Sequence, residues 1–419
     1  QQGHIKSQQE FDSASKRSLM VVAKSKGKKS NVPAFMGFVK RELRQEYSLS
    51  QLHNQGLRLF TSLDPLVQKK AEKALTQRLN ILDNNAQAKG LQGAVVVSDI
   101  KSGDIIAMVG DRDSNFVGFN RAIDAYRQTG SVIKPFVYLA ALRQSNYYHL
   151  QTPISDTSFN LVGNDGSEWS PQNYDKQTHG QIPLQEGLIN SYNMATARLA
   201  LDIGIDEVVD SLGDAGFERP LPAFPSLALG AEEMSPLEVL RLYQVIANDG
   251  VAIRGGGIVA VQDHQGQLLQ RYPRHSQVKF EPETIFQIKH LLTQVVERGT
   301  AKAIGQIFPN KQYAGKTGTT NDLKDSWYAG FGGEKLAVVW LGKDDNSPSH
   351  LTGASGALTV WRDLFKQLNE PSLKATLPEG LVWGYPQGGF FSRFSDCHNK
   401  PLTPFVPENL PEEFAICEE

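Results

Sequence analysis

Residues 93–109 read GAVVVSDIKSGDIIAMV. The run from Gly93 to Ile100 is rich in Val, which is typical of a buried strand. The Lys-Ser-Gly that follows predicts a tight turn, and residues 104–109 then return as a second strand. We therefore expect a β-hairpin here, and with it the beginning of an antiparallel sheet.

More strands are predicted toward the other end of the chain. Residues 326–332 and 335–343 favour two adjacent strands, and residues 257–272 favour a hairpin that turns between Asp263 and Gly266. Between these strands, helices are predicted at residues 127–143, 184–203, 235–249 and 282–298. The third begins with Ser235 and has Glu238 three residues on, which is the pattern of a capping box. Strands near both ends with mainly helices between them favour the α+β class, with an antiparallel sheet assembled from both ends.

The flanks differ in composition from this core. Residues 1–60 begin with a polar, basic stretch and are expected to form a linker or inter-domain segment, with a helix at 33–43 and a strand at 56–61. A helix is predicted at 65–79. We expect the main domain to span 61–367 and a Pro- and Gly-rich C-terminal extension to span 368–419.

Composition excludes several classes of function. The net charge of −2 argues against nucleic-acid binding. The sequence contains no run of 18 or more apolar residues, so no membrane-spanning helix is predicted in it. Two cysteines, Cys397 and Cys417, make no zinc site. Their sparing use fits an oxidising compartment with one disulfide closing the tail, although two unrelated thiols fit as well. No metal or cofactor constellation is present.

Ser131 and Lys134 form the first of three short motifs. Residues three apart share one face of a helix, so the Lys134 amine is expected to reach the Ser131 hydroxyl. A serine nucleophile needs a neighbouring base, and lysine serves only where its pKa falls. Ser-x-x-Lys also occurs at Ser13, Ser25 and Ser98, but only Ser131 follows a glycine and begins an apolar helix, where free N–H groups can bind an oxyanion.

Two further motifs follow in order. Ser191-Tyr192-Asn193 offers a second hydroxyl to shuttle a proton and an amide to hold a substrate peptide bond. Lys316-Thr317-Gly318-Thr319-Thr320 is expected on a strand edge, with Gly318 letting a ligand lie against the backbone and the threonine hydroxyls binding a carboxylate. Each motif is weak alone, whereas the ordered trio is typical of penicillin-binding proteins and related β-lactamases.

The flanking residues strengthen this interpretation. The chain resembles the class A penicillin-binding proteins, and within them the 1b-like branch of Gram-negative bacteria, over roughly residues 56–365. The matching stretches are residues 127–135, 169–174, 190–193, 229–231, 235–238, 247–250, 299–301, 315–322 and 325–331. This resemblance implies the penicillin-binding/β-lactamase-like fold, in which helices flank the sheet beside a mostly helical subdomain. It also makes 61–367 a transpeptidase domain.

The resemblance implies a role for each motif residue. Ser131 is expected to attack the penultimate D-Ala of a stem peptide, with Lys134 as the base and with Ser191 and Lys316 passing a proton to the leaving amine. The backbone N–H groups of Ser131 and Thr319 would form the oxyanion hole. The substrate-binding residues would be Asn193, Thr317, Gly318 and Thr319.

Partners and location follow from the same resemblance. The expected ligands are stem peptides ending in D-Ala-D-Ala and β-lactam antibiotics. The parent protein is expected at the periplasmic face of the inner membrane, with a glycosyltransferase domain, a membrane anchor and a periplasmic or outer-membrane activator protein. Residues 1–60 contain neither the anchor nor the catalytic-glutamate segment of a glycosyltransferase, which suggests an excised fragment.

Other functions remain open at the level of sequence. A β-lactamase would need rapid hydrolysis of the acyl-enzyme, and Glu168 or Glu186 could activate the water. A D,D-carboxypeptidase differs only in using water as acceptor, and some esterases share Ser-x-x-Lys. A β-lactam sensor or scaffold with an inactive site is the non-enzymatic alternative. The loss of Lys134 or Lys316 would support it, but both lysines are present. His179 is interpreted as a rim or structural residue.

Overall fold

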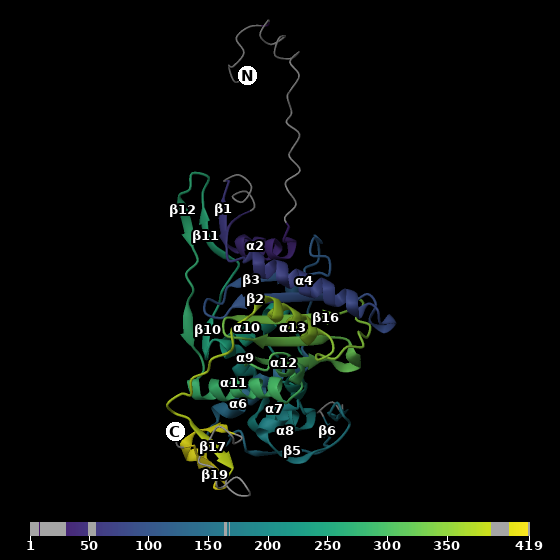
Figure 1. Ribbon diagram of the computed structural model, residues 1–419, viewed down its shortest axis with the longest axis vertical. Helices are drawn as coiled ribbons and strands as arrows, with labels where there is room; N and C mark the ends of the chain where they lie inside the picture. Colours follow the sequence, from purple (N-terminus) through teal and green to yellow (C-terminus); the bar gives the residue numbers. More distant parts are fainter. Residues whose placement is uncertain are drawn as a thin grey trace. The chain divides into compact units, whose positions relative to one another are not determined.

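The computed structural model describes residue 8 and residues 31–48, 56–162, 166, 168–386 and 402–417. The chain divides into two compact units, residues 1–31 and 32–419. The second unit carries all of the motifs described above and is the one described below (Figure 1).

A five-stranded antiparallel sheet forms the centre of this unit. Its strands, in spatial order, are β14 (Ala314–Thr319), β15 (Ser326–Phe331), β16 (Lys335–Gly342), β2 (Gln92–Asp99) and β3 (Ile105–Val109). The pairing of Val96 with Val338 joins the two distant parts of the chain. The predicted α+β architecture, with one sheet built from both ends of the sequence, is confirmed.

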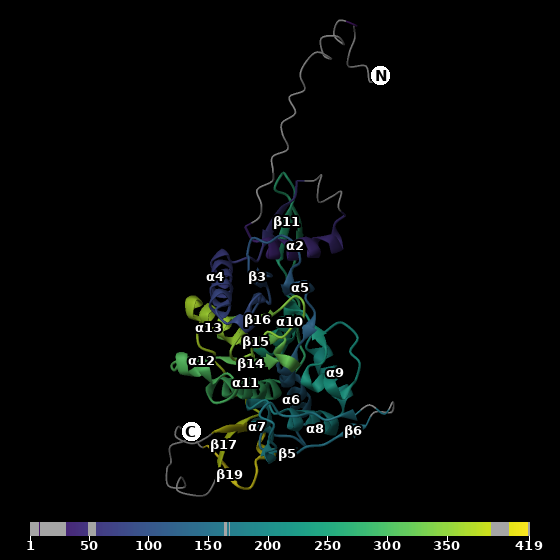
Figure 2. The ribbon, with the colours of Figure 1, turned by 90° about the vertical axis from the view of Figure 1, so that its right-hand side faces the viewer.

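Helices cover both faces of the sheet (Figures 1 and 2). Val95 and Val97 point into a cluster shared with α4 (Pro65–Leu82) and α13 (Ala357–Leu368). Val96 points into the larger cluster, which includes α10 (Pro236–Ala247). Because neighbouring residues of a strand face opposite sides, a continuous valine run is buried on both.

The remaining large helices form a subdomain beside the sheet. They are α6 (Lys134–Arg143), α7 (Leu184–Ile189), α8 (Asn193–Ile203), α9 (Ile205–Asp214) and α11 (Pro282–Glu297). Helix α6 is buried at every residue from Lys134 to Leu142. An apolar surface all around a helix requires neighbours on every side, and this makes α6 the centre of the subdomain.

A second, smaller sheet lies beside α2 (Pro33–Glu46). Its strands are β1 (Arg58–Thr61), β11 (Ile258–Gln262) and β12 (Leu268–Arg271), so the predicted hairpin at 257–272 is confirmed. The buried residues of α2, Phe35, Phe38, Val39 and Leu43, belong to the larger core cluster. The capping box predicted at Ser235 and Glu238 is also present.

Two predicted helices are wrong in their extent. Residues 127–128 are not helical but pair as β4 (Arg127–Gln128) with β9 (Glu233–Met234), and a 3₁₀ turn, η2 (Gly130–Ile133), precedes α6. The helix expected at 184–203 is broken between α7 and α8. Gly130 and Ser191 have φ values of 52° and 61°, which no α-helix can accommodate.

The C-terminal part carries a third sheet of β17 (Val382–Pro386), β18 (Thr403–Phe405) and β19 (Phe414–Ile416). The remaining short elements are η1 (Ala86–Ala88), α5 (Arg121–Asp124), β5 (Pro153–Asp156), β6 (Leu161–Val162), β7 (Glu168–Trp169), β8 (Gly180–Pro183), η3 (Pro225–Leu229), β10 (Val251–Ile253), β13 (Ser276–Val278), α12 (Lys302–Ile307), η4 (Asn321–Leu323) and η6 (Pro407–Asn409).

Two expectations about the ends of the chain stay predictions. The pairing of the two cysteines involves Cys397, which lies outside the described residues. The division into domains at 60/61 and 367/368 is also untested, although α2 lies before the first of these boundaries and packs on the core.

Within the described residues, no helix has both the length and the apolar character needed to cross a bilayer.

Candidate active site

The three sequence motifs meet at one hydroxyl group. Ser191 lies between α7 and α8, Lys134 begins α6 and Lys316 belongs to β14. The Lys316 Nζ lies 2.9 Å from Ser191 Oγ, and the Lys134 Nζ lies 3.3 Å from the same oxygen. Three elements that are distant in sequence thus place two amines on either side of the Ser191 hydroxyl.

Lys134 is held by a complete set of polar contacts. Its amine is fully buried and donates hydrogen bonds of 2.7 Å to the Ser191 carbonyl and 2.7 Å to Asn193 Oδ1. Burial lowers the pKa of Lys134 well below its ordinary value, and the charge of Lys316 lowers it further, while Asp156 opposes the change. A neutral amine has two N–H groups and one lone pair. The two carbonyl oxygens take both N–H groups, which leaves the lone pair available to accept a proton.

Lys316 is equally buried but has a different role in the network. Burial lowers its pKa from 10.5 to about 7. Its Nζ donates to Ser191 Oγ and, at 3.1 Å, to the Thr317 carbonyl. The amine therefore changes its protonation near neutral pH while in contact with the hydroxyl that bridges to Lys134.

Ser131 lies on η2, three residues before Lys134, and is partly exposed. The sequence predicts contact between the Lys134 amine and the Ser131 hydroxyl along a helix, but the three hydrogen-bond partners of Lys134 Nζ belong to Ser191 and Asn193. The amine is engaged by the loop before α8 in the free protein. Catalytic hydrogen bonds of this kind often form only once substrate is bound.

Two glycines bring the nucleophile turn against β14. A Cβ on Gly130 would lie 2.6 Å from the Thr319 carbonyl oxygen, and a Cβ on Gly318 would lie 2.8 Å from the Thr129 carbonyl oxygen. From the sequence, Gly318 is expected to let a ligand lie against the backbone. In the structure, the absence of a Cβ at Gly130 and Gly318 allows two segments of the protein to pack closely. This contact brings the turn that holds Ser131 against Thr319.

The threonines of β14 have partners that the sequence did not suggest. The hydroxyl groups of Thr317 and Thr300 are 2.7 Å apart, and Thr319 Oγ1 accepts a hydrogen bond of 2.9 Å from the Gly353 N–H. Thr300 precedes α12 and is joined to β14 only by the fold. No spacing rule in the sequence connects residues 300 and 317.

Helix α8, which follows Ser191, is capped by side chains from other elements. Tyr192 occupies its N-cap position without making a capping hydrogen bond. Instead, Asn173 Oδ1 accepts from the Asn193 N–H at 2.6 Å and from the Met194 N–H at 3.3 Å, and Asp156 Oδ1 accepts from the Ala195 N–H at 3.0 Å. These bonds satisfy the first N–H groups of α8, which in many helices are satisfied by the side chain of the N-cap residue itself.

Asp156 connects this cap to His179. The buried carboxylate accepts from Asn173 Nδ2 at 2.6 Å and lies 2.6 Å from His179 Nδ1. The His179 ring stacks on Tyr192 with 4.0 Å between centroids. His179 therefore has structural contacts beside the Ser191 loop, in line with its interpretation as a rim or structural residue.

The two glutamates considered for water activation have other partners. Glu186 receives hydrogen bonds of 2.7 and 3.0 Å from Arg298, and the exposed Glu168 accepts from Asn160 at 3.1 Å. Among the residues that the structure describes, no group of three or more His, Cys, Asp or Glu side chains is arranged to hold a metal ion.

Comparison with known proteins agrees with this geometry. Residues 93–347 match a family model described as the penicillin binding protein transpeptidase domain. That range contains all three motifs and the whole central sheet except Gln92, so the match covers more than half of the chain and the site itself.

Curated relatives extend the similarity beyond this range. The chain is 38% identical over 376 residues to penicillin-binding protein 1B of Vibrio cholerae, covering 88% of this chain and 48% of that protein. It is 34% identical over 414 residues to penicillin-binding protein 1B of Escherichia coli K12, covering 98% and 49%. The chain thus spans about half the length of the curated relatives it matches.

Solved structures show the same fold at lower sequence identity. The 2.6 Å crystal structure of penicillin-binding protein 1A from Haemophilus influenzae aligns with a TM-score of 0.81 at 21% identity, covering 97% of this chain and 80% of that one. A penicillin G acyl-enzyme complex of penicillin-binding protein A from M. tuberculosis aligns with a TM-score of 0.62 at 20% identity, covering 75% and 81%.

Proposed function

Since this chain belongs to the penicillin-binding protein transpeptidase family, we propose that it is a serine D,D-transpeptidase that cross-links the stem peptides of peptidoglycan. The observation that carries this proposal is the convergence of two buried lysines on the Ser191 hydroxyl, with Lys134 directly following the turn η2 that holds the partly exposed Ser131. That arrangement supplies a nucleophile, a base whose pKa is lowered and a route for its proton.

In the proposed acylation step, Ser131 Oγ bonds to the carbonyl carbon of the penultimate D-Ala as Lys134 takes the hydroxyl proton. The C–N bond to the terminal D-Ala then breaks, and its amine leaves with a proton delivered through Ser191 and Lys316. The backbone N–H groups of Ser131 and Thr319 are proposed to bind the oxyanion. In the second step the amine of another stem peptide attacks the ester and releases Ser131.

The substrate would be held by Asn193 and by the edge of β14, at Thr317, Gly318 and Thr319. The amide of Asn193 is engaged on both sides, because its Oδ1 accepts from Lys134 at 2.7 Å and its Nδ2 donates to the Gln172 carbonyl at 2.7 Å. The second N–H group and the second lone pair of this amide are the groups that a substrate peptide bond would use.

β-Lactams are proposed to acylate the same serine, because they resemble the D-Ala-D-Ala end. A β-lactamase would then need a base to activate water for hydrolysis. The ion pair of Glu186 with Arg298 and the hydrogen bond of Glu168 to Asn160 favour slow hydrolysis and a stable acyl-enzyme. Carboxypeptidase turnover, in which water replaces the amine, is proposed as a side reaction.

The rest of the proposal concerns the parent protein, since this chain spans about half of its relatives. We propose that the parent is also a peptidoglycan glycosyltransferase, is anchored in the inner membrane and works in the periplasm with an activator protein. The names of the relatives and the resemblance to class A proteins support this part of the proposal.

Intact-mass measurement with a fluorescent penicillin tests the central claim. The chain and its Ser131→Ala variant are incubated with the penicillin, denatured and weighed. We expect one stable adduct on the original chain and none on the variant. Rapid loss of the β-lactam ring without an adduct would favour a β-lactamase, and neither adduct nor turnover would favour a sensor or scaffold.

A further inference from the structure

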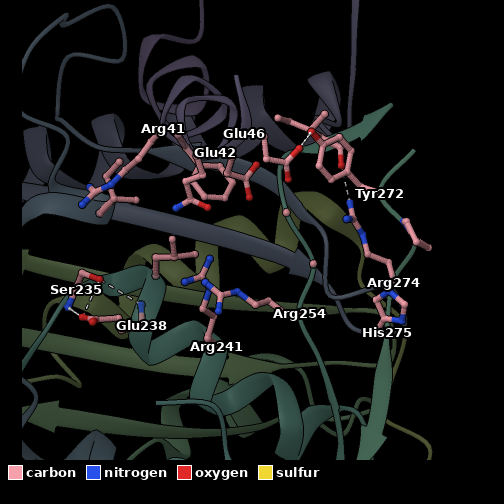
Figure 3. Close-up of a pocket in the computed structure, with 18 of the residues that line it drawn as sticks. Arg41, Glu42, Glu46, Ser235, Glu238, Arg241, Arg254, Tyr272, Arg274 and His275 are labelled. Atoms are coloured by element: carbon pink, nitrogen blue, oxygen red, sulfur yellow. Dashed lines mark hydrogen bonds between the residues drawn. The ribbon is translucent and has the colours of Figure 1, made fainter. Parts of the chain in front are cut away.

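A pocket of about 610 Å³ lies away from the active site, between α2, α10 and the β11–β12 sheet. Figure 3 shows its labelled side chains: Glu42 and Glu46 come from α2, Glu238 and Arg241 from α10, and Arg254, Arg274 and His275 from neighbouring segments. The volume is within the range of small-molecule sites. None of the three motifs contributes to it.

Arg241 is the unusual residue of this pocket. Its Nε is buried and has no hydrogen-bond partner, and no ion pair involves its guanidinium within the described residues. Burial lowers the pKa of Arg241 from its ordinary value. The side chain as a whole is only partly buried, but a buried guanidinium N–H without a hydrogen-bond partner is costly and calls for an explanation.

The charges of Glu42 and Glu238 act on Arg241, but neither carboxylate accepts a hydrogen bond from its guanidinium. Glu42 accepts a hydrogen bond of 2.8 Å from the Gly257 N–H, and burial raises its pKa. Glu238 is occupied by its capping box with Ser235 and by Arg219 at 2.8 Å. Glu46 accepts from the Tyr272 hydroxyl at 2.6 Å. Each of these carboxylates thus accepts a hydrogen bond from another group, and none is hydrogen-bonded to Arg241.

The other arginines differ from Arg241 in this respect. Arg41 donates to Asp124 at 2.8 Å, Arg254 pairs with Glu218, and Arg274 pairs with Asp104 at 2.5 Å. Arg271 lines the same pocket but is exposed to solvent. Among the arginines that line the pocket and that the structure describes, only Arg241 has a buried N–H group without a hydrogen-bond partner.

We propose that this pocket binds a carboxylate carried on an apolar body, with Arg241 as its partner. The planar fork of a guanidinium matches a carboxylate through two parallel hydrogen bonds. Tyr126, Tyr272 and Pro273 line the same pocket and keep accessible ring surface for the body of the ligand. The nearby glutamates disfavour a doubly charged phosphate, which makes a monocarboxylate the better match.

The test compares a charged probe with its neutral counterpart. Binding of 4-phenylbutyrate and of 4-phenylbutanamide is measured by ligand-observed NMR titration for the full chain and for its Arg241→Met and Arg271→Met variants. We expect saturable binding of the acid by the original chain, at least tenfold weaker binding by Arg241→Met, and a change below threefold for the exposed control Arg271→Met. The amide is expected to bind the original chain at least tenfold more weakly than the acid.

Thermal melting without ligand separates this proposal from a purely structural role. Because Arg241 lacks a partner in the free protein, Arg241→Met is expected to melt at the same temperature as the original chain or higher. A lower melting temperature would assign Arg241 to the support of the fold and overturn the proposal. Equal binding of acid and amide, unchanged affinity in Arg241→Met, or no saturable binding of the acid at millimolar concentration would overturn it as well.

Discussion

At the scale of single residues, the two site lysines owe their chemistry to burial. Lys316 is fully buried, yet its recorded partners are neutral groups, the Ser191 hydroxyl and the Thr317 carbonyl. Lys134 likewise donates to carbonyl oxygens. Desolvation without a carboxylate partner disfavours the charged form of an amine. Burying these two amines therefore lowers the stability of the folded state and, by lowering their pKa values, increases the share of the neutral form that can accept a proton.

This cost predicts a pH-dependent difference between the chain and Lys316→Met. The unfolded amine holds its proton up to about 10.5 and the folded amine only up to about 7, so the unfolded state binds more protons between these values and stability rises with pH. The variant lacks this dependence. Its free energy of unfolding relative to the original chain is expected to fall by roughly 2–3 kcal/mol from about pH 7 to about pH 9.

Urea unfolding at both pH values measures this difference. Lys302→Met is the matched control, because Lys302 is exposed and its removal is expected to leave the pH dependence unchanged. A Lys316→Met variant with the same pH dependence as the original chain would show that Lys316 is not desolvated as described.

At the scale of elements, the nucleophile turn depends on a close contact between η2 and β14. Gly130 has a φ of 52° and its N–H donates to the Gly230 carbonyl at 3.1 Å. The hydroxyl of Tyr243, on α10, donates at 2.6 Å to the Val132 carbonyl. The position of Ser131 is therefore set by a glycine contact on one side and a helix on the other.

Gly130→Ala tests this contact. The new Cβ would lie 2.6 Å from the Thr319 carbonyl oxygen and the residue would keep a left-handed backbone, so we expect a loss of at least about 2 kcal/mol in unfolding free energy and a fall in penicillin acylation rate. Gly213→Ala is the control. It lies in α9 with nothing within 4 Å of the added carbon and is expected to be neutral or slightly stabilising. Equal effects of the two substitutions would contradict this account of η2.

The remote cap of α8 leads to a second prediction at this scale. Asn173→Ala removes the acceptor for the Asn193 and Met194 N–H groups, which should cost about 1–2 kcal/mol of stability. Since the loop with Ser191 directly precedes these groups, we expect the acylation rate to fall as well. Unfolding and acylation are measured alongside Asn160→Ala, an exposed asparagine expected to change neither. Normal acylation in a destabilised Asn173→Ala would limit this cap to a structural role.

At the scale of the whole molecule, the site depends on cores on both sides of one sheet. The larger cluster includes Val132 and Ile133 of the nucleophile turn together with Phe35, Phe38, Val39 and Leu43 of α2. The smaller cluster contains Trp361 and Phe365 of α13. Helix α2 is thus part of the same packed body as the site, although its sequence precedes the predicted transpeptidase domain.

Truncation tests this arrangement. A chain that begins at Val32 is expected to bind penicillin like the original, because residues 1–31 form a separate unit. A chain that begins at Gly56 lacks four buried side chains of α2, each worth about 1.5–3 kcal/mol, and should lose most of its stability. Urea unfolding and adduct formation measure both. A stable, fully active shorter chain would place the domain boundary after α2.

The sequence by itself determined the fold class and the motif residues. Alternation and runs of apolar residues identified the strands of the central sheet, and the capping box identified the start of α10, because both depend on neighbours along the chain. The ordered motifs identified Ser131, Ser191 and Lys316 in the same way. Local patterns predicted helices that continue through Gly130 and Ser191. In the structure both residues have a left-handed backbone, which interrupts the helix and depends on contacts with distant segments.

Only the tertiary structure decided how these residues act together. The contact of Lys134 with Ser191 rather than Ser131, the cap of α8 by Asn173 and Asp156, and the pairing of Thr317 with Thr300 all join separate elements. The same holds for the unpartnered Arg241, since its burial depends on α2 and the β11–β12 sheet. Side-chain desolvation and hydrogen bonding across a fold are properties of three-dimensional proximity, which spacing along the chain does not encode.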